Sequence, residues 1–100
     1  MIRKVLTGKQ KSFLRSLGTK LEPVVNIGKE GLTPAVVTAA REAVRKRELI
    51  KVRVQQNCME TPEEAISVLA ERAGTELVQI IGRNGLLYRK NAEKPKIDLP

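Results

Sequence analysis

Residues 26–34 read Asn-Ile-Gly-Lys-Glu-Gly-Leu-Thr-Pro, and this stretch decides the fold because it joins a strand directly to a helix. The residues just before the turn are mainly apolar, which favours a strand. Thr33 and Pro34 predict a helix start, since threonine is a good N-cap and proline fits the first helical position. Between the two elements, Gly28 and Gly31 permit a sharp turn and the close approach of another backbone.

The same turn has the features of a phosphate-binding site. The predicted helix N-terminus presents unpaired N–H groups and a partial positive charge, and Lys29 lies inside the turn. Our hypothesis is that Gly28, Lys29, Glu30 and Gly31 hold a nucleic-acid backbone. An ordinary strand-to-helix turn is the alternative, because a lone Gly-x-x-Gly pattern is not specific. Glu30 argues against the hypothesis, since a carboxylate repels a phosphate unless its side chain turns away.

The charge of the chain favours a polyanionic partner. Nineteen Lys and Arg residues against eleven Asp and Glu residues give a net charge of +8, and the isoelectric point is near 10.1. RNA or DNA is therefore favoured over a membrane surface. The signs are also segregated along the chain, because residues 1–59 carry 13 basic and 4 acidic side chains whereas residues 60–76 carry 1 and 5.

Composition excludes much chemistry. The chain has no histidine and one cysteine, Cys58, so it lacks the commonest general base, an internal disulfide and a structural zinc site. No P-loop, dinucleotide fingerprint or nucleophile elbow appears. We therefore predict a protein that is not an enzyme and has no cofactor, metal or small-molecule substrate. Because no membrane span or signal peptide is evident, the expected location is cytoplasmic.

Periodicity, caps and turn residues predict three helices and four strands in the order αβαβαββ. The helices are expected at 8–17, 34–47 and 62–73, and the strands at 24–27, 49–56, 76–81 and 86–89. This pattern predicts one α/β domain over residues 1–100 with a four-stranded mixed sheet, and an extended basic tail at 91–100. The first three strands should pair in parallel where they share the sheet. Asn84-Gly85 predicts a hairpin turn before the last strand.

The apolar residues of the predicted elements define the expected core. Phe13, Leu14 and Leu17 share one face of the first helix, which favours burial of all three. In strand 49–56, apolar and polar residues alternate, so Lys51 and Arg53 should lie together on a more open face of the sheet.

The expected layout brings several cations to the end of the sheet that carries the turn. Lys29 lies within the turn, Arg83 lies at the hairpin tip, and a first helix antiparallel to the first strand would bring Lys9 and Lys11 there. We expect Arg15, Arg41 and Arg53 to flank this cluster. Lys46, Arg47 and Lys51 should lie too far away, because the second helix carries its last turn roughly 20 Å from its start.

Taken together, the motifs resemble a known family. The stretches LTGKQKSFLRSLG, PVVNIGKEGLT, ELIKVRVQQN, LVQIIGRNGLLYR and KIDLP, spread from residue 6 to residue 100, resemble the bacterial YhbY-type proteins of the CRM family of RNA-binding domains. The resemblance implies a fold similar to the C-terminal domain of bacterial initiation factor three. It also implies RNA binding through the Gly28–Gly31 turn and nearby basic residues, and association with precursors of the large ribosomal subunit during ribosome assembly.

Two other kinds of binding module remain open. A DNA-binding module fits the charge, although no helix-turn-helix pattern appears, and a protein-interaction module could dock through the acidic helix 62–73 and leave the basic face incidental. Because Phe13 and Tyr88 are the only aromatic residues, we expect recognition of RNA shape and backbone more than of bases. The expected oligomeric state is a monomer.

Overall fold

The computed structural model describes residues 6–91 and 93–100, and residues 1–5 and 92 of the predicted domain lie outside this description. It contains three helices and four strands in the predicted order αβαβαββ, which is therefore confirmed. The elements are α1 (Gly8–Gly18), β1 (Pro23–Ile27), α2 (Pro34–Arg47), β2 (Leu49–Val54), α3 (Pro62–Arg72), β3 (Glu76–Ile81) and β4 (Asn84–Tyr88).

The four strands form one mixed sheet in the order β1-β2-β4-β3. The expected parallel pairing holds for β1 and β2, whereas β2 and β3 do not pair directly, because β4 lies between them and is antiparallel to both. The short hairpin after β3 places β4 directly beside β3. The other edge of β4 pairs with β2, so β4 separates β2 from β3. β2 and β3 still run in the same direction, so their carboxyl ends lie at one end of the sheet.

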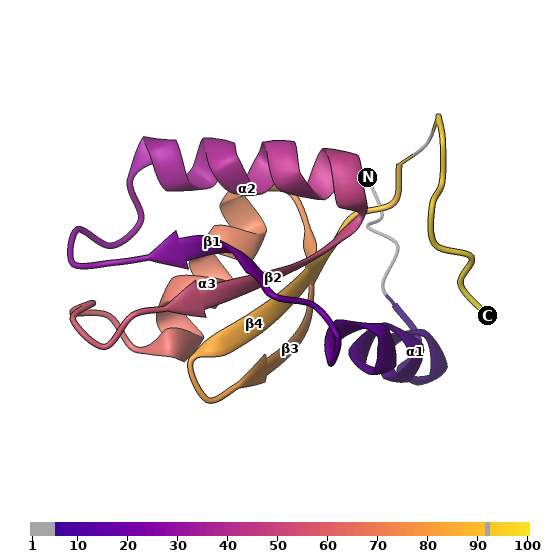
Figure 1. Cartoon of the computed structure of the whole chain (residues 1–100), viewed down its shortest axis with the longest axis horizontal. Coiled ribbons are helices and arrows are strands. Elements are labelled where there is room, and N and C mark those ends of the chain that lie inside the picture. Colours follow the sequence, from indigo (N-terminus) through magenta and orange to yellow (C-terminus); the bar gives the residue numbers. More distant parts are fainter. Residues whose placement is uncertain (1–5, 92) are drawn as a thin grey trace.

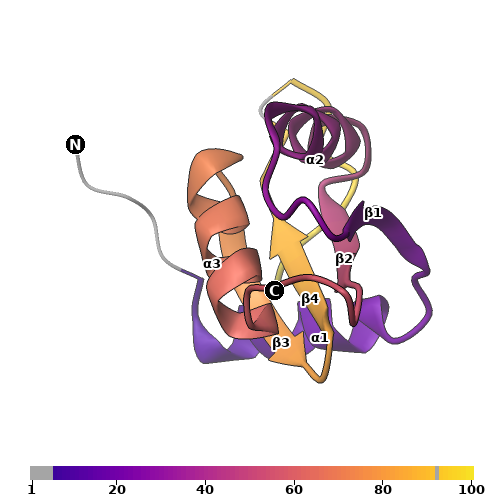
Figure 2. The same ribbon diagram turned by 90° about the vertical axis from the view of Figure 1, so that its left-hand side faces the viewer.

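The helices cover the two faces of the sheet unequally. α2 and α3 lie together on one face, and α1 lies on the other (Figures 1 and 2). The larger core, under α2 and α3, includes the fully buried Ile27, Val52, Val54 and Leu69. A smaller core under α1 is centred on Leu14. Because α1 is short, this second face of the sheet is only partly covered.

α1 packs through fewer apolar side chains than its sequence suggests. Leu14 is fully buried, but Phe13 and Leu17 each remain 37% exposed. The helix extends one residue beyond the expected end at Leu17, to Gly18, and its C-cap is Thr19. A Cβ atom at Gly18 would lie 2.3 Å from Leu86 Cδ1, so glycine here lets α1 approach β4 closely.

The hairpin turn lies two residues earlier than expected. β3 ends at Ile81 and β4 begins at Asn84, so Gly82 and Arg83 form the turn. Gly82 has a φ of 57°, which suits the first central position of a two-residue hairpin. Gly85 lies inside β4, where a Cβ atom would be 2.6 Å from Ile66 Cγ2 of α3. The predicted hairpin is confirmed, but Asn84 and Gly85 belong to β4 and not to the turn, because this glycine serves packing of the sheet against α3.

A buried carboxylate holds the C-terminal tail. Glu48, between α2 and β2, is fully buried. Its φ is 64°, a backbone conformation that residues other than glycine rarely adopt. Its carboxylate accepts hydrogen bonds from the backbone N–H groups of Asn91 (2.8 Å), Ile97 (2.7 Å) and Lys96. Ile97 and Leu99 then pack against the smaller core. The tail therefore has a defined path along the domain, beside the last turn of α2.

The single tyrosine, Tyr88, gives a direct test of this packing. Tyr88 is 3% exposed in the smaller core, and burial, with a further contribution from the Glu48 carboxylate, raises its pKa above the usual 10.0. Because the pKa is raised in the folded state, the buried, neutral Tyr88 contributes fully to stability below about pH 10. This contribution is lost as the pH rises further and the hydroxyl ionises.

Tyrosinate absorbance, which reports this residue alone, should therefore show a midpoint above pH 10 in the folded protein. We expect unfolding in denaturant to return the midpoint to about 10. As the pH rises above 10, the melting temperature of Tyr88→Phe should fall less than that of the unchanged protein, because phenylalanine does not ionise. A folded-state midpoint at or below 10 would contradict the burial of Tyr88 beside Glu48.

Candidate nucleic-acid interface

The Gly28–Gly31 turn is a hydrogen-bonded β-turn at one end of the sheet (Figure 1). The Gly31 N–H donates to the Gly28 carbonyl oxygen at 2.9 Å, which places Lys29 and Glu30 at the exposed corners. Gly31 has a φ of 71°, so this position requires glycine. The turn itself therefore explains one of the two glycines.

Among the described residues, backbone N–H groups without a hydrogen-bond partner lie just before the start of α2. Thr33 caps the helix as predicted, because its side chain accepts a hydrogen bond from the Val36 N–H at 3.2 Å. Within the described part of the chain, the N–H groups of Lys29, Glu30 and Leu32 donate no hydrogen bond. These donors lie beside the positive end of the α2 dipole, and such an arrangement suits a phosphate oxygen.

Two neighbouring loops support the turn. The Gln55 N–H, just after β2, donates to the Ile27 carbonyl oxygen at 2.9 Å, and a Cβ atom at Gly28 would lie 3.3 Å from Gln55 Oε1. Glu60 Oε1 would lie 2.8 Å from a Cβ atom at Gly31. Glu60 is thus a second carboxylate near the turn, besides Glu30, and sequence reasoning missed it because it is distant along the chain.

The predicted position of Arg83 is confirmed. Its guanidinium donates to the carbonyl oxygens of Val54 (2.9 Å) and Gln55 (2.8 Å), so the hairpin tip is fastened to the loop that contacts the turn. These bonds use two of the five guanidinium N–H donors. Arg83 therefore supplies positive charge at a fixed position, and it also has a structural role that the sequence did not reveal.

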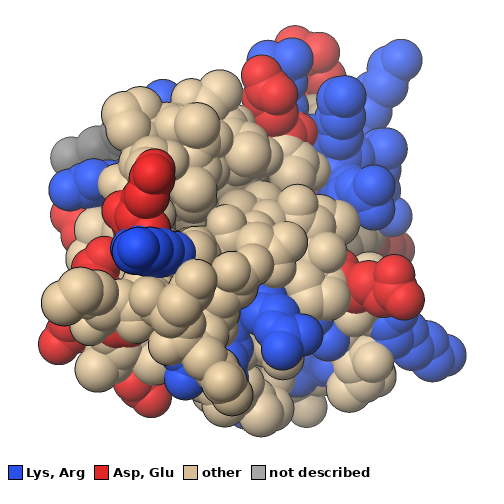
Figure 3. All heavy atoms as spheres, turned by 60° about the vertical axis from the view of Figure 1, so that its left-hand side comes forward, with Lys and Arg blue, Asp and Glu red and all other residues tan. Residues whose placement is uncertain are grey.

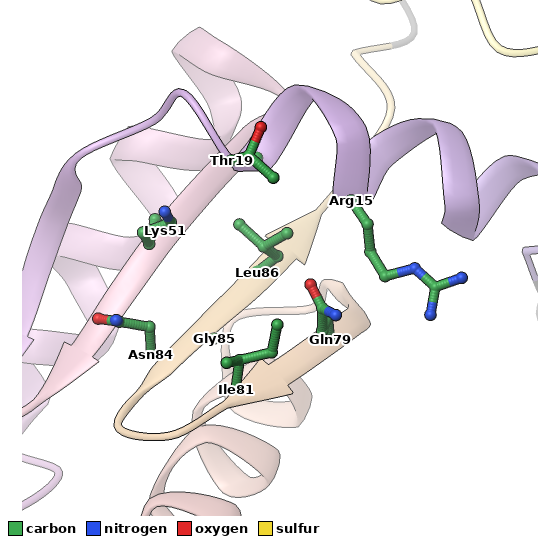
Figure 4. Close-up of a pocket in the computed structure, with 9 residues that line it drawn as sticks. Arg15, Thr19, Lys51, Gln79, Ile81, Asn84, Gly85 and Leu86 are labelled. Atoms are coloured by element: carbon green, nitrogen blue, oxygen red, sulfur yellow. The ribbon is translucent and has the colours of Figure 1, made fainter.

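Arg53 extends this end of the interface onto the open face of the sheet. It is exposed on β2, and the strand register places Asn26 of β1 and Asn84 of β4 directly beside it. Figure 4 shows Lys51, Gln79 and Asn84 around one hollow on this face, with Arg15 of α1 at its side. Polar side chains of three strands thus lie on the same open face as Arg15 and Arg53, together with the apolar Ile81 and Leu86.

Lys9 and Lys11 do not lie near the turn, so their predicted position was wrong. Gln10, between them, donates to the carbonyl oxygen of Pro100 at 3.4 Å and lies near Gly74 and Tyr88, at the opposite end of the sheet. Figure 1 shows α1 extending away from β1 and not back along it. The close packing of Gly18 on Leu86 directs the helix there, and no residue pattern in the sequence indicates that direction.

Arg41 has a structural partner that the sequence did not reveal. Its guanidinium donates to the carbonyl oxygen of Arg72, through Nε at 3.3 Å and Nη2 at 2.8 Å. Arg72 is the last residue of α3, so Arg41 of α2 satisfies a carbonyl at the end of the neighbouring helix. Its exposed charge remains available to a ligand.

The charge is unevenly distributed over the surface. Figure 3 shows Lys and Arg gathering along one edge of the visible face, whereas much of the middle of that face is uncharged. Tyr88, one of the two aromatic residues, is buried and therefore offers no surface on which a base could stack. Among the residues that the structure describes, no group of three His, Cys, Asp or Glu side chains could hold a metal ion. None of the described helices is long and apolar enough to cross a membrane.

The fold and the site together define a small α/β domain that presents a Gly-x-x-Gly turn and a helix N-terminus beside exposed basic side chains. The chain belongs to the CRS1 / YhbY (CRM) domain family, whose description matches residues 6–89. The expected family membership is thereby confirmed.

Similar proteins have RNA binding in their names. The chain is 42% identical to "Probable RNA-binding protein YqeI" of Bacillus subtilis, over 96% of this chain and all of that protein. It is 40% identical to an "RNA-binding protein" of Haemophilus influenzae, over 95% of each chain. The solution structure of protein SAV1595 of Staphylococcus aureus, for which RNA binding has been suggested, matches with a TM-score of 0.80 and 41% identity over 96% of this chain and all of that one.

Proposed function

We propose that this protein is an RNA-binding protein that acts in ribosome assembly, as a monomer on the ribosomal RNA of large-subunit precursors. The single observation that carries the proposal is the cluster of free N–H groups at Lys29, Glu30 and Leu32, beside the N-terminus of α2. The RNA-binding names of the related proteins favour RNA as the source of the phosphate.

The proposed contact has two parts. The backbone N–H groups of the turn hold one phosphate, and Lys29 supplies its charge. Arg83 and Arg53 guide the flanking RNA backbone, with Arg15 further along the open sheet face. Arg41, Lys9 and Lys11 lie outside this cluster, and any contact they make involves a more distant part of a long RNA. Glu30 lies at an exposed turn corner, where its side chain can turn toward solvent.

Charge reversal at Lys29 tests this contact. We expect Lys29→Glu to weaken RNA binding about tenfold, since it replaces one favourable phosphate interaction by a repulsive one. Lys20→Glu is the matched control, because Lys20 is also exposed, carries the same charge and lies in the loop before β1, away from the turn. Affinity would be measured by fluorescence anisotropy, and circular dichroism would verify that both variants fold.

The salt dependence of binding provides a second readout from the same titrations. If about five phosphates are contacted, log K should fall with log salt with a slope of roughly −3.5 on single-stranded RNA. Lys29→Glu should reduce the magnitude of that slope. Equal losses of RNA affinity for Lys29→Glu and Lys20→Glu would indicate attraction by the overall positive charge of the protein and not a specific phosphate-binding site at the turn. Preferential binding of duplex DNA in competition would contradict RNA as the partner.

The role in ribosome assembly requires a test in cells. Crosslinking to RNA in growing cells should recover ribosomal RNA of large-subunit precursors, and Lys29→Glu should lower the yield more than Lys20→Glu does. Association with ribosomal particles that survives both RNase treatment and high salt would instead favour a protein-interaction module.

A further inference from the structure

A second basic surface lies beside the C-terminal half of α2, at the opposite end of this helix from the turn. It is a hollow of about 820 Å³ between α2 and the chain that follows β4, and seven of its ten lining residues are Lys or Arg. Glu42 and Glu93 are the only acidic residues among the ten. We call this surface the tail groove. Its cations come from Arg41, Arg45 and Lys46 of α2 and from Arg89, Lys90, Lys94 and Lys96.

The backbone of the tail is held in place relative to the end of α2. The Glu48 carboxylate binds the N–H groups of Asn91, Lys96 and Ile97, as described above. The Asn91 side chain makes three more hydrogen bonds, because its Nδ2 donates to the Arg45 carbonyl oxygen and its Oδ1 accepts from the N–H groups of Glu93 and Lys94. The backbone on either side of Lys94 is therefore anchored to the end of α2.

The charge of the tail groove is unfavourable to folding without a partner. Seven cations share one hollow with two carboxylates, and like charges closer than about 8 Å are not fully screened at physiological salt. Arg45 and Lys46 have a structural reason for their charge, because they lie in the last turn of α2, and Arg41 donates to the Arg72 carbonyl oxygen. The four cations that follow β4 have no such helix-end position. A chain of phosphates complements such a groove better than a single small anion, because it presents regularly spaced negative charges along its length.

The position of the groove also fits the RNA-binding proposal. The turn lies at the start of α2 and the groove lies along its C-terminal half, so the two surfaces are up to about 20 Å apart at 1.5 Å per residue. At about 3.4 Å per step, roughly six consecutive nucleotides cover that distance. One RNA molecule can therefore contact both surfaces at once.

We propose that the tail groove is a second RNA-backbone contact, in which Lys94 and Lys96 of the anchored tail and Arg45 and Lys46 of α2 bind phosphates beyond those held by the turn. This inference rests on the proposed function for its choice of RNA as the polyanion. It adds residues that the turn does not position and gives the C-terminal tail a role in binding.

The test compares matched double variants of the full chain. Lys94→Gln/Lys96→Gln removes two groove cations whose side chains are exposed, and Lys20→Gln/Arg72→Gln removes two exposed cations outside both surfaces. We expect the groove variant to bind a single-stranded RNA of about twenty nucleotides about tenfold more weakly and to lower the magnitude of the salt slope by about 1.4, or 0.7 for each lost phosphate contact. The control variant should change neither quantity appreciably.

Combination with Lys29→Glu distinguishes the two proposals. If both surfaces bind the same RNA independently, the losses from Lys29→Glu and from the groove variant should add in log K. A loss for the groove variant alone would support the groove and contradict the turn. Equal effects of the groove and control variants would overturn the groove proposal. It would also be overturned if the groove variant kept full RNA affinity but lost binding to a poly-glutamate peptide, because the groove would then be a surface for an acidic protein.

Discussion

Glu48→Gln is expected to lower the free energy of unfolding by about 3 kcal/mol. The Glu48 carboxylate is fully buried and accepts three backbone hydrogen bonds from the tail. An amide keeps the size but offers one acceptor oxygen and adds N–H donors, so some tail N–H groups lose their partner. A loss of this size should lower the melting temperature by about 12–24 °C in a domain of this length.

Glu42→Gln is the matched control for this prediction. Glu42 lies on the exposed side of α2, so the same chemical change there should alter stability by no more than about 0.5 kcal/mol. Both variants would be measured by thermal and urea unfolding. In Glu48→Gln, amide hydrogen exchange should also become faster at residues 96 and 97. Equal stability of the two variants would show that the tail does not depend on the buried carboxylate.

Gly31→Val is expected to weaken RNA binding about thirtyfold, more than the loss of charge at Lys29 alone. Gly31 has a φ of 71° and donates the hydrogen bond that closes the turn. A β-branched residue at this φ is strained by about 1–3 kcal/mol, and its Cβ atom would also displace the Glu60 carboxylate. The turn should therefore open, which removes the aligned N–H groups and the fixed position of Lys29 together.

Gly74→Val separates the loss of the turn from a general loss of stability. Gly74 has a φ of 70°, nearly the same as Gly31, but it lies between α3 and β3, where a Cβ atom would make only an ordinary contact with Arg89. Both variants should lose similar stability, and only Gly31→Val should lose RNA affinity beyond its unfolded fraction. If the two variants bind RNA equally well, the turn is not the contact.

Local features of the fold could be predicted from the sequence because local chemistry determines them. Thr7, Thr33 and Thr61 cap the three helices through hydrogen bonds to a backbone N–H three residues later. The alternation of apolar and polar residues in β2 correctly predicted that Ile50 and Val52 are buried and that Arg53 is exposed. Such patterns report which residues form an element and which face is buried.

Features that depend on long-range packing could not be predicted in this way. The direction of α1 depends on contact between Gly18 and Leu86, which are far apart in the chain, so Lys9 and Lys11 were assigned to the wrong end. Glu48 resembles any glutamate at the end of a helix, and its partners lie more than forty positions away. The tail groove was missed for the same reason, although the lysines at 90, 94 and 96 were visible as a basic run.

The most direct test of RNA binding at the turn is an amide NMR titration of the full chain with RNA. The free N–H groups of Lys29, Glu30 and Leu32 should show large shifts as a phosphate becomes their acceptor, whereas the amides of the acidic helix α3 should remain unchanged. Shifts confined to α3, or unchanged amides at 29–32 in a saturated complex, would contradict the proposed contact.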